Sequence, residues 1–248
     1  MVDLGLTGKA FVVTGASRGL GLAGATALRA EGADVVLAAR DPAAVEAAAA
    51  SLGATGITAD MGEPAAAEQL VRACLSAYGR VDGALISVGG PPAGPALGLS
   101  DEQWRAAFES VFLGAVRLCR AVVEALPPEG GSIALVLSSS VKSPVSGLAA
   151  SNGLRPGLAM LAKTMADELG PRGIRVNGLL PGRVDTDRMR ELDGDDPAVR
   201  AAVEQGIPLR RYGLPEEFGR VAAFLLSPAA SFVSGAMVPV DGGAVRAL

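Results

Sequence analysis

The chain has 248 residues, half of them hydrophobic, and a formal net charge of −4. A single hydrophobic core is possible at this length, and the slightly acidic balance argues against a nucleic-acid partner. No apolar run reaches the roughly 20 residues that a membrane-spanning helix needs, and the first ten residues do not resemble a signal peptide. We therefore expect a cytoplasmic protein with no membrane partner.

Short apolar runs alternate along the chain with segments of helical spacing. Strands are predicted at 10–15, 33–40, 55–60, 81–87, 131–140, 173–182 and 236–243, and helices at 21–32, from about 42, at about 63–78, 101–126 and 156–170. Apolar strands that alternate with helices are typical of a parallel sheet covered on both faces. The pattern predicts a single α/β domain, residues 1–248, with a doubly wound parallel sheet of about seven strands. Its site should lie at the carboxyl ends of the strands.

Acid–base side chains are scarce in this sequence. It has no histidine, two tyrosines and three lysines, so a mechanism that moves protons has few candidate groups. The two cysteines, Cys74 and Cys119, fall in predicted helices, and we expect buried free thiols rather than a disulfide. No metal site is predicted.

The sequence TGASRGLG (14–21) follows the first predicted strand and places Gly15, Gly19 and Gly21 before a helix. Glycines there let the backbone approach a pyrophosphate, which the N–H groups of the helix N-terminus then bind. A tight strand–helix turn that needs glycine for steric reasons alone is the alternative. The motif predicts a dinucleotide site.

Arginine stands where the second predicted strand ends. A carboxylate at that position would bind an unphosphorylated ribose, whereas Arg40 can pair with a 2′-phosphate, and Arg18 in the glycine-rich turn offers a second cation. The two arginines favour NADP(H) over NAD(H). A purely solvated Arg40 is the alternative.

These motifs, with LTGKAFVVTGASRGLG at one end and IPLRRYGLPEEFGRVAAFLLSPAASFVSGAMVPVDGG at the other, resemble the short-chain dehydrogenase/reductase family over nearly the whole chain. The resemblance implies a Rossmann fold and a small carbonyl or alcohol substrate. It also implies that Asp60 contacts the adenine, although Asp60 could equally cap the following turn. Asn177 and Thr186 would lie beside the nicotinamide, where Thr186 holds the carboxamide. The implied cofactor-binding residues are Gly15, Ser17, Arg18, Gly19, Leu20, Gly21, Arg40, Asp60, Gly89, Arg155, Pro181, Gly182, Val184 and Thr186.

The family's catalytic residues are mostly missing at the matching positions. The family uses a serine to orient the carbonyl, a tyrosine as acid, a lysine that lowers the tyrosine pKa, and an asparagine that holds a water. The serine is kept as Ser138, with Ser139 and Ser140 as close alternatives, but Val111 stands at the asparagine position. The tyrosine and lysine positions hold Ser151 and Arg155.

Arg155 could still bind the ribose as a permanent cation, but it does not readily release a proton. Ser151 is a poor acid and much shorter than a phenol. Because the residue before a proline is disfavoured in a helix, we predict that the helix begins near Pro156 and that residues 151–155 form a turn. A kinked helix through the proline is the alternative.

Lys142 is the one lysine expected near the site, in the sequence SSSVKSP after the fifth strand. A lysine with a depressed pKa could donate a proton or bind an anionic substrate, and a solvated loop lysine is the alternative. Neither Tyr78 nor Tyr212 is expected to replace the missing acid.

The resemblance leaves three functions open. The favoured one is an NADP(H)-dependent carbonyl or 3-oxoacyl reductase in which Ser138 orients the carbonyl and Lys142 or a water replaces the tyrosine. A catalytically impaired relative that binds dinucleotide as a sensor or oligomer partner is the second, and a non-redox lyase or isomerase is the third. The resemblance also implies a homotetramer or homodimer, and a substrate lid at 187–207 that is mobile before ligand binds.

Overall fold

A computed structural model describes residues 3–194 and 196–247. Seven parallel strands form one sheet in the order β3-β2-β1-β4-β5-β6-β7. Their bounds are β1 Ala10–Thr14, β2 Asp34–Ala39, β3 Thr55–Thr58, β4 Gly83–Ile86, β5 Gly131–Val136, β6 Ile174–Pro181 and β7 Met237–Val240. The predicted single-domain α/β fold with a doubly wound parallel sheet is confirmed. The strand order reverses between β1 and β4, and a crevice for a ligand opens at such a switch point.

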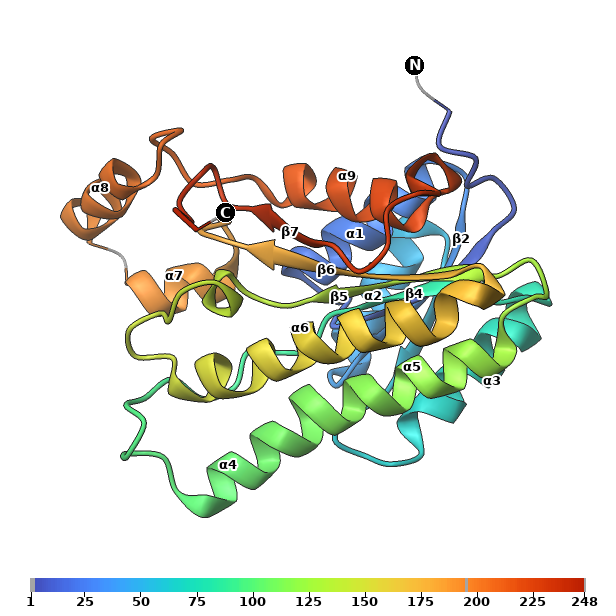
Figure 1. Cartoon of the computed structure of the whole chain (residues 1–248), viewed down its shortest axis with the longest axis horizontal. Helices are drawn as coiled ribbons and strands as arrows, with labels where there is room; N and C mark the ends of the chain where they lie inside the picture. Colours follow the sequence, from blue (N-terminus) through green and yellow to red (C-terminus); the bar gives the residue numbers. More distant parts are fainter. Residues whose placement is uncertain (1–2, 195, 248) are drawn as a thin grey trace.

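Helices cover both faces of the sheet (Figure 1). On one face lie α1 (Gly19–Ala30), α2 (Pro42–Leu52) and α9 (Pro215–Leu226), which share a hydrophobic core with the sheet. On the other lie α3 (Ala66–Tyr78), α4 (Asp101–Ala107), α5 (Gly114–Ala125) and α6 (Ala149–Leu169). The helices α7 (Asp187–Asp193) and α8 (Pro197–Gly206) lie beyond the carboxyl ends of the strands.

The helices depart from the prediction in several places. The predicted helix 101–126 is divided by a π-helical segment, Phe108–Leu113, which joins α4 to α5. Helix α9 was not among the predicted elements, although Pro215 at its first turn and Glu217, which accepts from the backbone N–H of Leu214, are usual signs of a helix start.

The prediction that the helix begins near Pro156 is wrong. Helix α6 starts at Ala149 and continues through the proline, so Ser151 and Arg155 lie on one helix, as the alternative proposed for this segment. Tertiary contacts outweigh the local preference on the N-terminal side of Pro156. The Asn152 side chain makes two hydrogen bonds with the backbone of Val145, and Arg155 is bonded to β5. These contacts hold the first two turns although proline removes a helical hydrogen bond.

Cys74 and Cys119 are both free and buried, as predicted. Burial raises the pKa of each thiol to about 12. Thiols with such pKa values stay protonated at neutral pH and are inert, so both serve as core residues. Over the ranges 3–194 and 196–247, no helix is long and apolar enough to cross a membrane.

At the amino ends of the strands, Asp82 is a buried carboxylate with three donors. Its oxygens accept from Lys9 at 3.3 Å, from Arg80 at 2.7 Å and from the backbone N–H of Ala10 at 2.9 Å. Burial raises the pKa of Asp82, but the bonds from Arg80 and Ala10 outweigh it, so the pKa is lowered overall. The carboxylate thus ties the start of β1 to the start of β4.

We expect Asp82→Asn to lower the free energy of unfolding by about 1–3 kcal/mol at pH 7, because the charge-assisted bonds are lost. Since the folded-state pKa lies below the unfolded value of about 3.9, this stabilisation is complete above that value. It disappears as the pH falls through the folded-state pKa. Urea unfolding at pH 7 and below pH 4 should therefore show a difference between the two proteins that shrinks with acid. Glu68→Gln, which removes an exposed ion pair with Arg72, should change stability by no more than about 0.5 kcal/mol and is the control.

Candidate functional site

The ends of β1 and β4 are joined directly at the switch point. The Thr14 hydroxyl donates to the Ser87 carbonyl at 2.8 Å and accepts from the Ser87 N–H at 3.0 Å. Both residues are buried. The glycine-rich turn after β1 and the loop after β4 are therefore held side by side. They flank the place where a fold of this class binds its ligand, called the crevice below.

The glycine-rich turn has no room for side chains on its inner side. A Cβ on Gly15 would lie 2.5 Å from the Ser87 carbonyl oxygen, and one on Gly21 would lie 2.3 Å from the Gly15 carbonyl oxygen. Gly15 and Gly19 also have φ of +58°, which favours glycine. Gly15 is nevertheless solvent-exposed. Bare backbone thus faces the crevice at the start of α1, which fits the pyrophosphate of a dinucleotide.

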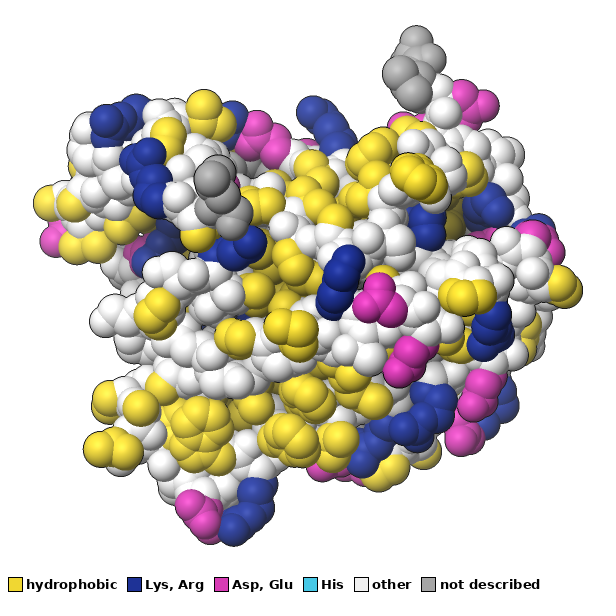
Figure 2. Space-filling model, in the orientation of Figure 1, with side chains coloured by type: hydrophobic (Ala, Val, Ile, Leu, Met, Phe, Trp, Pro, Cys, Tyr) yellow, Lys and Arg dark blue, Asp and Glu magenta, His cyan; other side chains and the backbone are white. Residues whose placement is uncertain are grey.

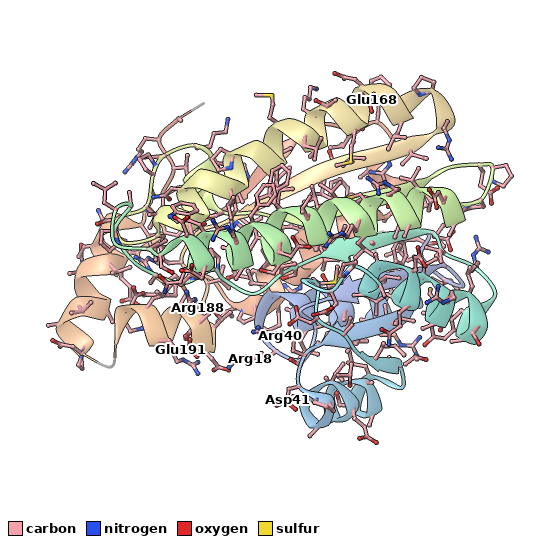
Figure 3. The ribbon with its side chains drawn as sticks, turned by 90° about the horizontal axis from the view of Figure 1, so that it is seen from below. Arg18, Arg40, Asp41, Glu168, Arg188 and Glu191 are labelled. Carbon is pink, nitrogen blue, oxygen red and sulfur yellow. The ribbon has the colours of Figure 1, made fainter. Side chains whose placement is uncertain are left out.

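Two arginines stand at the outer part of this crevice. Arg40, exposed after β2, brings its Nη2 within 3.9 Å of where a Cβ on Gly89 would lie. The Arg18 side chain is 69% exposed, and its Nη1 lies 3.8 Å from Asp187 and 3.9 Å from Glu191 on α7. Figure 3 shows both arginines on the same side of the molecule as α7. Both arginines that were predicted to pair with a 2′-phosphate therefore lie on the side of the molecule that carries α7.

The segment after β6 forms the third side of the crevice. Thr186 caps α7 by accepting from the Met189 N–H, and its methyl carbon lies 3.6 Å from where a Cβ on Gly19 would lie. Pro181 ends β6, whereas Val184 is buried in a bridge with Gly213. Thr186 is thus the member of this segment that reaches the glycine-rich turn.

For Asn177, Asp60 and Gly182, which the resemblance assigned to the cofactor site, the fold itself gives a structural role. The Asn177 side chain bonds the backbone of Val233 and Ala236 from within β6, so it serves the β6–β7 edge rather than the crevice. Asp60 accepts from the N–H of Gly62 in a turn. A Cβ on Gly182 would lie 2.6 Å from the Cβ of Asp241, so packing alone requires glycine there. Ser17 and Leu20 are half-buried in the glycine-rich turn.

A serine cluster occupies the end of β5. The half-buried Ser138 accepts from the Ser140 N–H at 3.0 Å, and the hydroxyls of Ser140 and Ser151 lie 3.4 Å apart in the protein interior. The Ser151 hydroxyl therefore has an internal partner, while Ser138 keeps part of its surface open. The resemblance placed Ser140 and Ser151 in the same site, but a hydrogen bond between them was not predicted, because helix α6 was expected to begin later.

Arg155 points into the protein. Its Nη1 donates to the carbonyls of Val136 at 2.7 Å and Leu137 at 2.8 Å, and the residue is 7% exposed. Burial lowers the pKa of the guanidinium to about 10, which still leaves it protonated at neutral pH. Arg155 therefore fixes the end of β5, two residues before Ser138. Because its guanidinium keeps its proton at neutral pH, it is not suited to serve as the acid of the reaction.

The loop between β5 and α6 carries Lys142. The lysine is exposed and follows a short 3₁₀ turn, Ser139–Val141, which Ser138 caps. Asn152, on α6, holds the same loop: its side chain accepts from the Val145 N–H and donates to the Val145 carbonyl. Asn152 was not predicted to have a role, and no sequence pattern marks it.

Val111, Tyr78 and Tyr212 are the remaining residues considered for the water site and the acid, and each has other surroundings in the fold. Val111, at the family's asparagine position, is buried in the π-helical segment and offers no polar group. Tyr78 donates to the Val35 carbonyl at 3.0 Å, and Tyr212 donates to Asp193 at 2.7 Å. Burial and Asp193 raise the pKa of Tyr212 to about 12. Tyr78 thus has its hydrogen-bond partner on β2, and Tyr212 has its partner on α7.

A doubly wound parallel sheet with a bare glycine-rich turn at its switch point defines a Rossmann-type nucleotide-binding protein. Residues 15–245 match the family model described as enoyl-(acyl carrier protein) reductase. The chain is 31% identical to the 3-oxoacyl-[acyl-carrier-protein] reductase of Escherichia coli K12, over 95% of this chain and 97% of that protein. It is 34% identical to dehydrogenase/reductase SDR family member 4 of Oryctolagus cuniculus, over 96% and 94%.

Among solved structures, L-sorbose reductase from Gluconobacter frateurii, complexed with NADPH and L-sorbose, superposes with a TM-score of 0.93. The match covers all of both chains at 30% identity. An actinorhodin polyketide ketoreductase with NADPH gives a TM-score of 0.91 at 29% identity, over 96% of this chain and 97% of that one. The chain belongs to the short-chain dehydrogenase/reductase family and is an oxidoreductase by descent.

Proposed function

We propose that this protein is an NADP(H)-dependent reductase of a small carbonyl compound, of ketone or 3-oxoacyl type, with a rearranged catalytic site. The observation that supports the proposal is that Ser138 is half-buried just after the carboxyl end of β5 and accepts a hydrogen bond from the Ser140 N–H. When bound, NADPH would supply the hydride to the carbonyl carbon. Ser138 would donate a hydrogen bond to the carbonyl oxygen and orient it.

The preference for NADPH over NADH is supported by Arg40 and Arg18. Both are exposed cations at the outer end of the crevice, and guanidinium groups pair well with phosphate. Two similar proteins have NADPH in their solved structures. Fluorescence titration should give a lower Kd for NADPH than for NADH, and equal affinities would contradict the preference.

The proton that the developing alkoxide needs would come from Lys142 or from a water that Lys142 orients. Lys142→Ala should therefore lower the single-turnover rate of NADPH oxidation by about 10²-fold, within the range of general acid catalysis, and leave the Kd for NADPH unchanged. Lys163→Ala, on the far part of α6, is the matched control and should change neither quantity. An unchanged rate in Lys142→Ala would remove this lysine from the mechanism.

A catalytically impaired protein that binds dinucleotide is the second candidate, and Arg155 favours it. The guanidinium that would replace the family's lysine is bonded to two backbone carbonyls inside the protein. Single-turnover experiments over a panel of ketones, sugars and 3-oxoacyl thioesters distinguish the two functions. Hydride loss to any of them supports the reductase, whereas tight NADPH binding with no oxidation supports a sensor or oligomer partner.

We further propose a homotetramer or homodimer, and a substrate lid at residues 187–207, of which residue 195 lies outside the described residues. Figure 2 shows hydrophobic side chains gathered over the part of the surface formed by α4, α5 and α6. Phe108 is 42% exposed and stacks on Phe112, and Met160 on α6 is 70% exposed. Apolar surface of this kind is often covered by another subunit. A monomeric mass from light scattering would contradict the oligomer.

A further inference from the structure

Arg188 is a cation at the crevice that the proposed function does not yet use. It lies on α7, and its Nη2 donates to the Pro91 carbonyl at 3.2 Å. Its Nε lies 3.0 Å from where a Cβ on Gly90 would be, so the guanidinium rests against the loop after β4. Figure 3 places Arg188 on the same side of the molecule as Arg18 and Arg40.

Helix α7 bridges the two walls of the crevice. Thr186, its N-terminal cap, lies against Gly19 of the glycine-rich turn, and Arg188 reaches Gly90 and Pro91 on the other wall. A dinucleotide in a fold of this class lies between these two loops. The Arg188 side chain thus lies against one of the two loops that would flank the phosphates.

The present partners of Arg188 are weak. Glu191 lies 3.6 Å away, the two side chains are 40% and 53% exposed, and such pairs contribute little to stability. The other partner is a single neutral carbonyl. A phosphate offers a guanidinium two charge-assisted bonds in a planar fork, which is a stronger interaction than either. Exchange of partners on nucleotide binding is therefore favourable.

The cation at position 155 is turned away from the crevice. Arg155 donates inward to Val136 and Leu137, and burial holds it there. We propose that Arg188 binds the pyrophosphate of the dinucleotide from α7 and draws this helix onto the bound nucleotide. This inference rests on the proposed function and adds one residue to its cofactor site.

Glu191 opposes this binding. It lies 3.6 Å from Arg188 and 3.9 Å from Arg18, so it partly neutralises two cations that would otherwise face phosphates. Removing its charge should strengthen nucleotide binding, while removing the Arg188 charge should weaken it. The two substitutions, both on α7, should therefore change the Kd for the nucleotide in opposite directions.

The test is fluorescence or calorimetric titration of the full chain with NADPH, NADH, ADP-ribose and 2′-AMP. In Arg188→Gln, the Kd for NADPH, NADH and ADP-ribose should each rise about tenfold or more, the usual effect of losing a charged hydrogen bond. The Kd for 2′-AMP, which has no pyrophosphate, should not change. Glu191→Gln should lower the first three values. Arg190→Gln is the matched control, because Arg190 is on the same helix but pairs with Asp185 and Asp187.

Each result separates the two proposals. Unchanged Kd values in Arg188→Gln would overturn the role of Arg188 and leave the proposed function standing. A loss limited to NADPH and 2′-AMP would overturn the pyrophosphate assignment, because it would place Arg188 at the 2′-phosphate. Equal losses of nucleotide affinity in Arg188→Gln and Arg190→Gln would also overturn the assignment, because they would show that any disturbance of α7 weakens binding. A wild-type protein that binds neither NADPH nor NADH would overturn the proposed function itself and this inference with it.

Discussion

Replacing Ser151 with tyrosine and Arg155 with lysine should raise the single-turnover rate of carbonyl reduction by about 10²–10⁴-fold, the usual contribution of a general acid. Both positions lie on the continuous helix α6, one turn apart, beside the serine cluster that includes Ser138. The family pair would therefore be restored in a helix that already has the required register. NADPH oxidation with the best carbonyl substrate of the wild-type protein is the measurement.

The matched control is Ser151→Phe with Arg155→Lys, which has the same ring without the hydroxyl. Because Ser151 is 5% exposed, either ring will have to displace neighbouring atoms, and both double variants should lose similar amounts of stability. A faster rate in the tyrosine variant alone would show that the acid was limiting. Equal rates in the two folded variants would mean that proton donation by a phenol does not limit this site.

Arg155→Ala should lower the free energy of unfolding by about 2–4 kcal/mol, because the carbonyls of Val136 and Leu137 lose a buried donor. The loss falls at the lower end of this range if water enters the space and bonds the carbonyls. Urea or thermal unfolding of the two proteins under identical conditions measures the difference.

Arg172→Ala is the control for this experiment. Arg172 also donates to a backbone carbonyl, that of Val123 at 3.2 Å, but it is exposed to solvent. Its loss should change stability by no more than about 0.5 kcal/mol. If Arg155→Ala were as mild as this control, Arg155 would not be holding the end of β5, and it would again be available as a ribose-binding cation.

The elements of the sheet were predictable because their signals are local. The apolar run Ala10–Thr14 followed by glycines, and the similar runs of β2, β5 and β6, require only neighbouring residues to be recognised. The start of α6 was predicted wrongly because the local signal of Pro156 was outweighed by the contacts of Asn152 and Arg155. Those partners lie up to 19 residues away in the chain.

The sequence by itself determined the α/β class, the glycine-rich turn and the absence of tyrosine and lysine at positions 151 and 155, because these are properties of residue type and spacing. Only the tertiary structure decided where the cations point. Arg155 is turned into the end of β5, while Arg188 reaches from α7 to the loop after β4. A long side chain takes its direction from whichever acceptors the fold brings near it, and here the nearest ones belong to other elements.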